Sequence, residues 1–127
     1  MRAKTLMLTA GLLFLPAALA AAPGDMSVAD FLQRAEKLQK KGMMAMFSGD
    51  IKLLKGEAQA AGEAYRARIV ADKEAGRPPH SCPPPGKQSM GSGEFLGHLR
   101  SYPAPAQQTT TIKVAFADLM RKRYPCP

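Results

Sequence analysis

The sequence predicts an all-α protein, a compact bundle of four to five helices with one disulfide. Three observations support this prediction: apolar residues recur at intervals of three and four along several segments, no stretch alternates as a β-strand does, and the chain holds two cysteines, Cys82 and Cys126. The chain has 127 residues, of which 46% are hydrophobic and 22% are charged. This length suits one domain and excludes a multidomain enzyme, and the apolar content is too high for intrinsic disorder.

Residues 1–22 are typical of a secretory signal peptide. Arg2 and Lys4 precede an uncharged, largely apolar run over residues 6–22, which ends in small residues. The alternative is a membrane anchor, but the run is shorter than the about 20 residues that a spanning helix needs, and Pro16 interrupts it. We therefore expect residues 23–127 to form a single helical domain in the bacterial periplasm, with no stable membrane anchor.

Export to an oxidising compartment favours a disulfide between Cys82 and Cys126. The alternative is a metal site that combines Cys82 with His80, but no second cluster of histidine and cysteine completes such a site. We therefore expect the disulfide and no metal ion at these residues.

The first predicted helix covers residues 28–41. Ser27 precedes it in the position of a capping hydroxyl, Asp30 follows three residues later, and Gly42 ends the pattern. Its apolar face consists of Val28, Phe31, Leu32, Ala35 and Leu38. Residues 42–50 are apolar and bracketed by glycines, which indicates a tight connector or a single helical turn.

A longer helix is predicted from Ile51 to the stop at Gly76-Arg77-Pro78, with Ser48 or Asp50 as its cap. Its apolar face consists of Ile51, Leu54, Ala58, Ala61, Tyr65 and Ile69. Small residues indicate that another helix approaches it closely, namely Gly56, Ala58, Ala60, Ala61 and Gly62. Residues 76–88 contain five prolines and are therefore predicted to be a stiff loop without regular structure.

Two further helices are predicted in the C-terminal part. One opens at Ser89 or Ser92 and ends at the Pro-Ala-Pro segment 103–105; its apolar residues are Phe95, Leu96, Leu99 and Tyr102. The other covers residues 110–123, and the basic residues of its last turn match the helix dipole. Its apolar face consists of Ile112, Ala115, Phe116, Leu119 and Met120.

Residue patterns that carry catalysis are absent from the sequence. His80 and His98 have no nucleophile motif beside them, the carboxylates are scattered singly, and the chain has neither a glycine-rich phosphate loop nor a His-Glu-x-x-His motif. We predict a protein that is not an enzyme and uses no cofactor. The net charge of +8 falls to +6 without Arg2 and Lys4, and no basic stripe interleaved with aromatic residues indicates nucleic acid. Binding to an acidic protein surface stays open.

The methionines of the connector, Met43, Met44 and Met46, have two interpretations. Thioethers bind copper(I) in some exported proteins, but one triplet offers few soft ligands. The favoured interpretation is that these side chains fill irregular gaps beneath the connector.

The C-terminal half carries three short motifs in order: His80-Ser81-Cys82-Pro83-Pro84-Pro85-Gly86, a helix containing Glu94-Phe95-Leu96 before Tyr102-Pro103, and a closing Arg123-Tyr124-Pro125-Cys126-Pro127. Together they resemble the Rap/Tai family of immunity proteins associated with bacterial type VI secretion. The segment from Lys55 to Arg66 is similar to the family's glycine-containing middle helix, although Lys55 or a neighbour stands where the family often has a cysteine.

The resemblance implies a small exported helical protein, often a homodimer, that binds a cell-wall-degrading effector such as a peptidoglycan amidase and blocks its active site sterically. The stiff loop is the candidate partner-binding segment, because prolines reduce the entropy lost on binding; its candidate residues are Pro78, Pro79, His80, Pro84 and Pro85. The connector 42–50 is a second candidate. The alternative function is a small periplasmic stress chaperone that exposes apolar surface under acid or heat.

Overall fold

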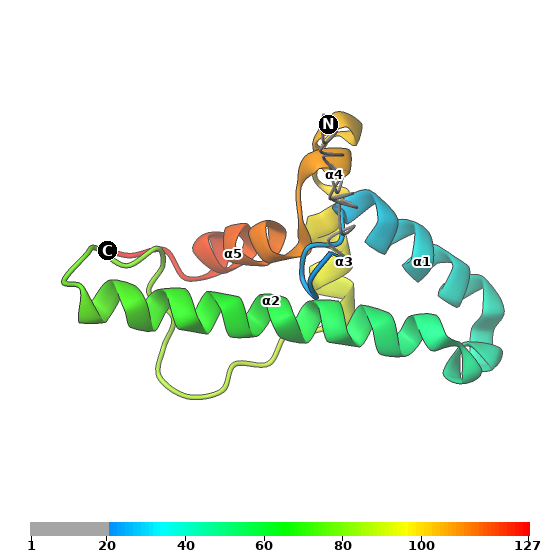
Figure 1. Ribbon diagram of the computed structural model, residues 1–127, viewed down its shortest axis with the longest axis horizontal. Coiled ribbons are helices and arrows are strands. Elements are labelled where there is room, and N and C mark those ends of the chain that lie inside the picture. Colours follow the sequence, from blue (N-terminus) through cyan, green and yellow to red (C-terminus); the bar gives the residue numbers. More distant parts are fainter. Residues whose placement is uncertain (1–20) are drawn as a thin grey trace, which may run out of the picture.

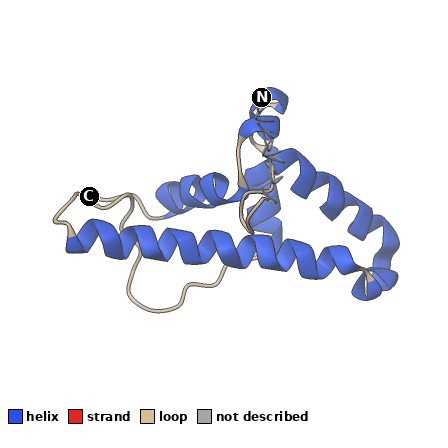
Figure 2. Cartoon of the chain, in the orientation of Figure 1, coloured by secondary structure: helices blue, strands red, loops and turns tan. Residues whose placement is uncertain are grey.

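The computed structural model describes residues 21–127 as a set of helices joined by loops (Figure 1, Figure 2). Residues 1–20, which hold nearly all of the predicted signal peptide, lie outside the described part. The helices are α1 (Val28–Lys41), the 3-10 helix η1 (Gly42–Phe47), α2 (Gly49–Glu74), α3 (Ser92–Arg100), α4 (Ala104–Thr109) and α5 (Ile112–Arg123). Over residues 21–127 the only β-structure is one isolated bridge between Ser27 and Thr111, so the all-α prediction is confirmed.

The long helix α2 organises the fold. In Figure 1, α1 lies over the N-terminal half of α2 and runs antiparallel to it, whereas α5 lies over the C-terminal half. The most extensive helix packing is between α2 and α5, and α3 packs against both α1 and α5. Within residues 21–127, no helix is both long and apolar enough to cross a bilayer.

The predicted apolar faces form the core. It contains residues from α1, α2, α3 and α5, namely Val28, Phe31, Leu32, Ala35, Leu54, Ala61, Phe95, Leu99, Ile112, Ala115 and Leu119. Aromatic rings meet edge to face across these helices: Phe31 with Phe95, Phe95 with Phe116, and Phe116 with Tyr65, at centroid distances of 5.7, 6.2 and 5.8 Å. Such contacts add to the free energy of burial.

The small residues of α2 contribute less to close packing than predicted. Ala61 is fully buried, and a Cβ at Gly62 would lie 3.8 Å from the ring of Phe116, which is an ordinary contact distance. A Cβ at Gly56 would meet open space. The close approach of α5 therefore depends on Ala61 and its neighbours rather than on the whole set of small residues.

Most helix ends follow the sequence signals. The Ser27 hydroxyl accepts from the Asp30 amide at 3.1 Å, and Gly42 ends α1 with a φ of 58°. Ser48 caps α2 through the Asp50 amide. Helix α3 begins at Ser92, one of the two predicted starts, but its N-cap is Gly91 and no side chain accepts a hydrogen bond there.

The short helix α4 was not predicted. Helix α3 ends at Arg100, before the Pro-Ala-Pro segment as expected, but the same segment also begins α4, with Pro103 as the N-cap. Proline is tolerated there because the first-turn amides have no intrahelical acceptor. The side-chain amide of Gln107 also donates to the Tyr102 carbonyl at 2.9 Å, which fixes the turn between α3 and α4.

The predicted disulfide joins Cys82 to Cys126. It connects the loop that follows α2 to the tail that follows α5, and the Cys82 amide donates to the Tyr124 carbonyl at 2.8 Å. The loop and tail are therefore held together both by the covalent bond and by a backbone hydrogen bond.

We expect the double variant Cys82→Ser/Cys126→Ser to lose much of its stability. The two cysteines are 44 residues apart, and opening a loop of this size costs about 4 kcal/mol of unfolding free energy in the chain-entropy model. Urea unfolding measures the loss. A reductant should lower the unfolding free energy of the wild type by a similar amount and leave that of the double variant unchanged. Two free thiols in the purified oxidised protein would contradict the assignment.

Candidate functional site

The proline-rich loop is exposed on both sides of a buried anchor. Pro78 and Pro79 precede the anchor, Pro84 and Pro85 follow it, and all four are exposed. The anchor is Ser81, whose side chain is 1% exposed. Ser81 thus divides the predicted partner-binding residues into two short segments of the loop, and His80, beside the anchor, is half-buried.

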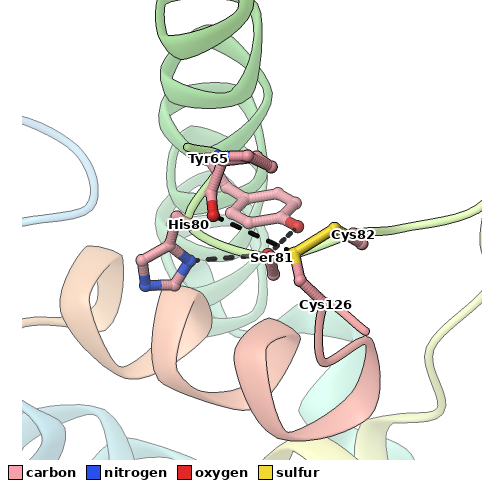
Figure 3. The surroundings of a disulfide bond; sticks show 6 residues. Tyr65, His80, Ser81, Cys82 and Cys126 are labelled. Carbon is pink, nitrogen blue, oxygen red and sulfur yellow. Dashed lines mark hydrogen bonds between the residues drawn. A yellow bond between two sulfur atoms is a disulfide. The ribbon is translucent and has the colours of Figure 1, made fainter. Parts of the chain in front are cut away.

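Ser81 connects this loop to α2, a role that the sequence did not indicate. Its hydroxyl shares a 2.5 Å hydrogen bond with the Tyr65 hydroxyl and lies 3.4 Å from Nδ1 of His80. Figure 3 shows Ser81 between the imidazole of His80 and the disulfide. A serine between a histidine and a cysteine carries no periodic signal, so only the fold reveals that this hydroxyl is buried and paired.

The connector between α1 and α2 presents the most exposed apolar side chains among the described residues. Met43, Met44, Met46 and Phe47 are 86%, 67%, 74% and 85% exposed, whereas Ala45 points inward and is buried. We call these four exposed residues the apolar tip. The expectation that the methionines fill gaps beneath the connector is wrong, because the six-residue 3-10 turn η1 has space for only Ala45 on its inner side. The copper interpretation stays a prediction.

The base of the apolar tip is held by polar contacts between α1 and α2. The Arg34 guanidinium pairs with the Asp50 carboxylate at 2.7 Å, and the Lys41 ammonium lies 3.4 Å from the Ser48 hydroxyl. Exposed lysines lie in the turns of both helices that adjoin the tip, namely Lys37, Lys40, Lys41, Lys52 and Lys55. The tip is therefore an apolar projection with a basic rim.

An apolar groove of about 540 Å³ lies beside the hairpin, between α1, α2 and α3. Leu38 and Ile51 line it near the tip, and Phe95 and Leu96 line it from α3. Met90, from the loop before α3, closes one side. The hairpin thus offers both a projection and an adjoining hollow.

The second histidine of the chain has a structural role. His98, which has no nucleophile motif beside it in the sequence, is 8% exposed, and its Nε2 donates to the Ala115 carbonyl at 2.9 Å. Burial lowers the pKa of His98, although the Ala115 carbonyl partly opposes this effect. Nearby, burial and the hydrogen bond to Asp118 raise the pKa of Tyr102, so its hydroxyl stays protonated.

A buried carboxylate on α2 fixes the N-terminal segment, and sequence reasoning missed it. Glu57 is 6% exposed, and its Oε2 accepts from the amides of Gly24 and Met26 at 2.6 and 3.2 Å. The same segment donates and accepts backbone hydrogen bonds with residues 110–113. In the sequence, Glu57 lies on the apolar face of α2 between apolar residues, and this position was the available signal that its carboxylate is buried.

Residues 21–127 contain no group of three or more histidine, cysteine, aspartate or glutamate side chains placed to hold a metal ion. No protein-family model, curated protein or solved structure matches this chain. The fold and its surfaces therefore define the class, a small helical domain with one disulfide and a projecting apolar tip.

We expect acid to destabilise the protein through His98. Its pKa is lower in the folded protein, so below about pH 6.5 the unfolded chain binds more protons and the unfolding free energy decreases. Above that pH its contribution is complete. Urea unfolding between about pH 7.5 and 5 should show this decrease, because this range brackets the ordinary histidine pKa of about 6.5. For one titrating group, the unfolding free energy should change by less than about 1.4 kcal/mol per pH unit.

The variant His98→Gln should flatten this decrease, because an amide can still donate to the Ala115 carbonyl but does not titrate. The pKa of His80 is also lowered, but His80 is only half-buried. The matched variant His80→Gln should therefore retain the larger part of the decrease in unfolding free energy. An unchanged pH dependence in His98→Gln would contradict the assignment.

Replacing the buried carboxylate should release the N-terminal segment. Glu57→Leu leaves the Gly24 amide without its acceptor, which costs about 1–3 kcal/mol of unfolding free energy. Hydrogen exchange at the Gly24 and Met26 amides should accelerate. The matched variant Glu63→Leu, an exposed position on the same helix, should leave both readouts unchanged; equal effects at the two positions would contradict the role of Glu57.

Proposed function

We propose that residues 23–127 form an exported binding protein of the immunity type, which seats its apolar tip in the active-site cleft of a cell-wall-degrading effector in the bacterial periplasm. The effector class is a peptidoglycan hydrolase such as an amidase. Inhibition is steric, and the protein contributes no catalytic group. The observation that carries the proposal is the exposure of Met43, Met44, Met46 and Phe47 at the end of a helical hairpin.

The energetics of the tip favour a binding role. Transfer of one large apolar side chain from water to a buried interface contributes about 1.5–3 kcal/mol. A few such residues carry most of the affinity in known interfaces, and methionine adapts its shape to irregular surfaces. Contiguous exposed apolar side chains on a soluble domain are typical of a docking surface.

The hairpin supports the tip without a large loss of entropy on binding. Ala45 is buried beneath the turn, Ser48 caps α2, and the pair between Arg34 and Asp50 joins the two helices at the base. A surface that is ordered before it meets its partner loses less conformational entropy in the complex.

The rim of the tip favours a partner with acidic residues around its cleft. Five lysines lie on the hairpin, and the carboxylates between residues 34 and 55 are Glu36 and Asp50, of which Asp50 is already paired with Arg34. Charge complementarity of this kind accelerates encounter and selects among partners.

The cysteine pair and the resemblance to the Rap/Tai family support the cellular part of the proposal. Disulfides are typical of proteins outside the cytoplasm, and Cys82 and Cys126 belong to two of the three motifs that carry the resemblance. The exposed prolines Pro84 and Pro85 are proposed as a secondary contact with the partner. The departure at Lys55 does not affect the tip.

The proposal is tested with envelope hydrolases encoded beside this gene. The purified protein should bind one of these hydrolases and inhibit its cleavage of peptidoglycan. Production of the protein should protect cells that produce the same hydrolase in the periplasm. Met46→Ser/Phe47→Ser should weaken binding by about 30-fold or more, because hot-spot residues contribute 2 kcal/mol or more. Circular dichroism checks that the helices are retained.

Val70→Ser is the matched control, since Val70 is an apolar residue on α2 that is 54% exposed and lies far from the tip. It should leave binding and protection unchanged. Absence of binding to every neighbouring hydrolase, or equal losses in both variants, would overturn the proposal. Suppression of client aggregation without hydrolase binding would instead support the chaperone alternative.

A further inference from the structure

A second surface lies at the other end of α2 from the apolar tip. It is a hollow of about 260 Å³ between the C-terminal half of α2, helix α5 and the start of the proline-rich loop. We call it the basic pocket; its lining includes Arg68, His80, Lys113, Val114, Ala117 and Arg121. Position 68 is about 30 Å along the helix from the tip, at 1.5 Å per residue.

The basic pocket has an excess of positive charge. Its lining contains Arg68, Lys113 and Arg121 but a single carboxylate, Asp118. Oδ2 of Asp118 accepts from the Tyr102 hydroxyl, so this carboxylate is bound to the turn that follows α3. Lys113 is paired with Asp25 at 3.1 Å.

Arg68 and Arg121 are the charged donors of the basic pocket that have no carboxylate partner within the described part of the chain. Over residues 21–127, no carboxylate lies within 4.0 Å of the guanidinium of Arg68 or Arg121, whereas Arg34, Arg77 and Arg123 each have one. A guanidinium presents planar paired donors that match a carboxylate or phosphate group. One arginine comes from α2 and the other from α5, so the pocket has a donor on each side.

The position of His80 completes the pocket. Its ring meets the Tyr65 ring edge to face at 6.3 Å, and the next residues are fixed by the Ser81 hydrogen bond and the disulfide (Figure 3). Burial lowers the pKa of His80 and the charges of Arg68 and Arg121 add to this, while Asp118 and Asp72 oppose it. The charges of both arginines therefore act at the position of the imidazole.

The remaining lining is apolar. Ala117 is buried at the base, and the exposed side chain of Val114 lies at the margin. A hollow of about 260 Å³ is larger than a carboxylate or phosphate group alone, so it has space for the apolar part of a ligand. Charged donors at the sides with an apolar base are typical of small-ligand sites.

We propose that the basic pocket binds a small organic anion, with the oxyanion between Arg68 and Arg121 and the apolar part against Ala117 and Val114. The site is separate from the apolar tip and does not depend on the proposed inhibition of a hydrolase. The shared chemistry is an oxyanion on an apolar body, and the experiment distinguishes a carboxylate from a phosphate monoester.

The test is a titration followed by amide NMR spectra at constant ionic strength. Benzoate and phenyl phosphate are the two anionic probes, acetate lacks the apolar body, and benzamide lacks the charge. We expect saturable shifts at the Val114 and Ala117 amides with at least one anionic probe, weaker binding of acetate and no saturable shift with benzamide. The tighter of the two anionic probes identifies the oxyanion.

Variants locate the site. Arg68→Gln and Arg121→Gln should each weaken binding of the tighter probe by about 10-fold, the size of one charge-assisted hydrogen bond. Arg66→Gln removes the same charge from an exposed position on α2 outside the lining, and should change the affinity by no more than about twofold.

Three outcomes would overturn the proposal. One is the absence of saturable shifts with both anionic probes, and a second is equal binding of benzamide. The third is an equal loss of affinity in Arg66→Gln and Arg121→Gln, which would indicate the general positive field alone. The wild-type apolar tip is intact in all these variants, so hydrolase binding is assayed independently of them.

Discussion

The disulfide between Cys82 and Cys126 is the constraint on which the arrangement of the C-terminal half depends. Helix α2 has 26 residues, so neither α1 nor α5 alone covers its apolar face. The chain leaves α2 through a proline-rich loop that has no regular structure, and the disulfide fixes both this loop and the tail of α5 at the same end of α2. The backbone bond from Cys82 to Tyr124 and the Tyr65–Ser81 hydrogen bond then place α5 against α2. The basic pocket forms where these elements meet.

The two ends of α2 are stabilised by different means, and this explains where apolar surface is exposed. At the C-terminal end, covalent and buried polar contacts close the structure. At the N-terminal end, η1 reverses the chain in six residues, and the pair between Arg34 and Asp50 is half-exposed. A half-exposed ion pair contributes little stability, so the hairpin depends mainly on Ala45 and on the α1 core residues Leu32 and Ala35. The outer side chains of the turn are then free of any packing role.

Local signals explain why much of the fold was predictable. The helix α1 follows its predicted bounds because Ser27 and Gly42 act within a few residues, and the apolar faces follow from spacing alone. The disulfide was predictable because the chain has only two cysteines. Other features depend on contacts between distant segments: Glu57 is buried because residues 24–26 cross α2, and His98 because α5 covers it. The sequence could not show whether the connector methionines point inward or toward solvent, because composition does not distinguish a covered turn from a projecting one. For the same reason, the sequence named the proline-rich loop but not its division by Ser81.

The charge around the apolar tip constrains which contact can cover it. In a symmetric dimer, the same surface of both copies meets, so a contact from tip to tip would bring ten lysines together, five from each copy. Like charges at the rim of an interface oppose association, whereas the apolar groove between α1, α2 and α3 has few charged lining residues, with Lys55 at its margin. Charge repulsion therefore disfavours a contact between two tips more than a contact through the groove. In the proposed complex, a partner with an acidic rim would remove this repulsion. The lysines that disfavour contact between two tips are thus the residues that would favour such a partner.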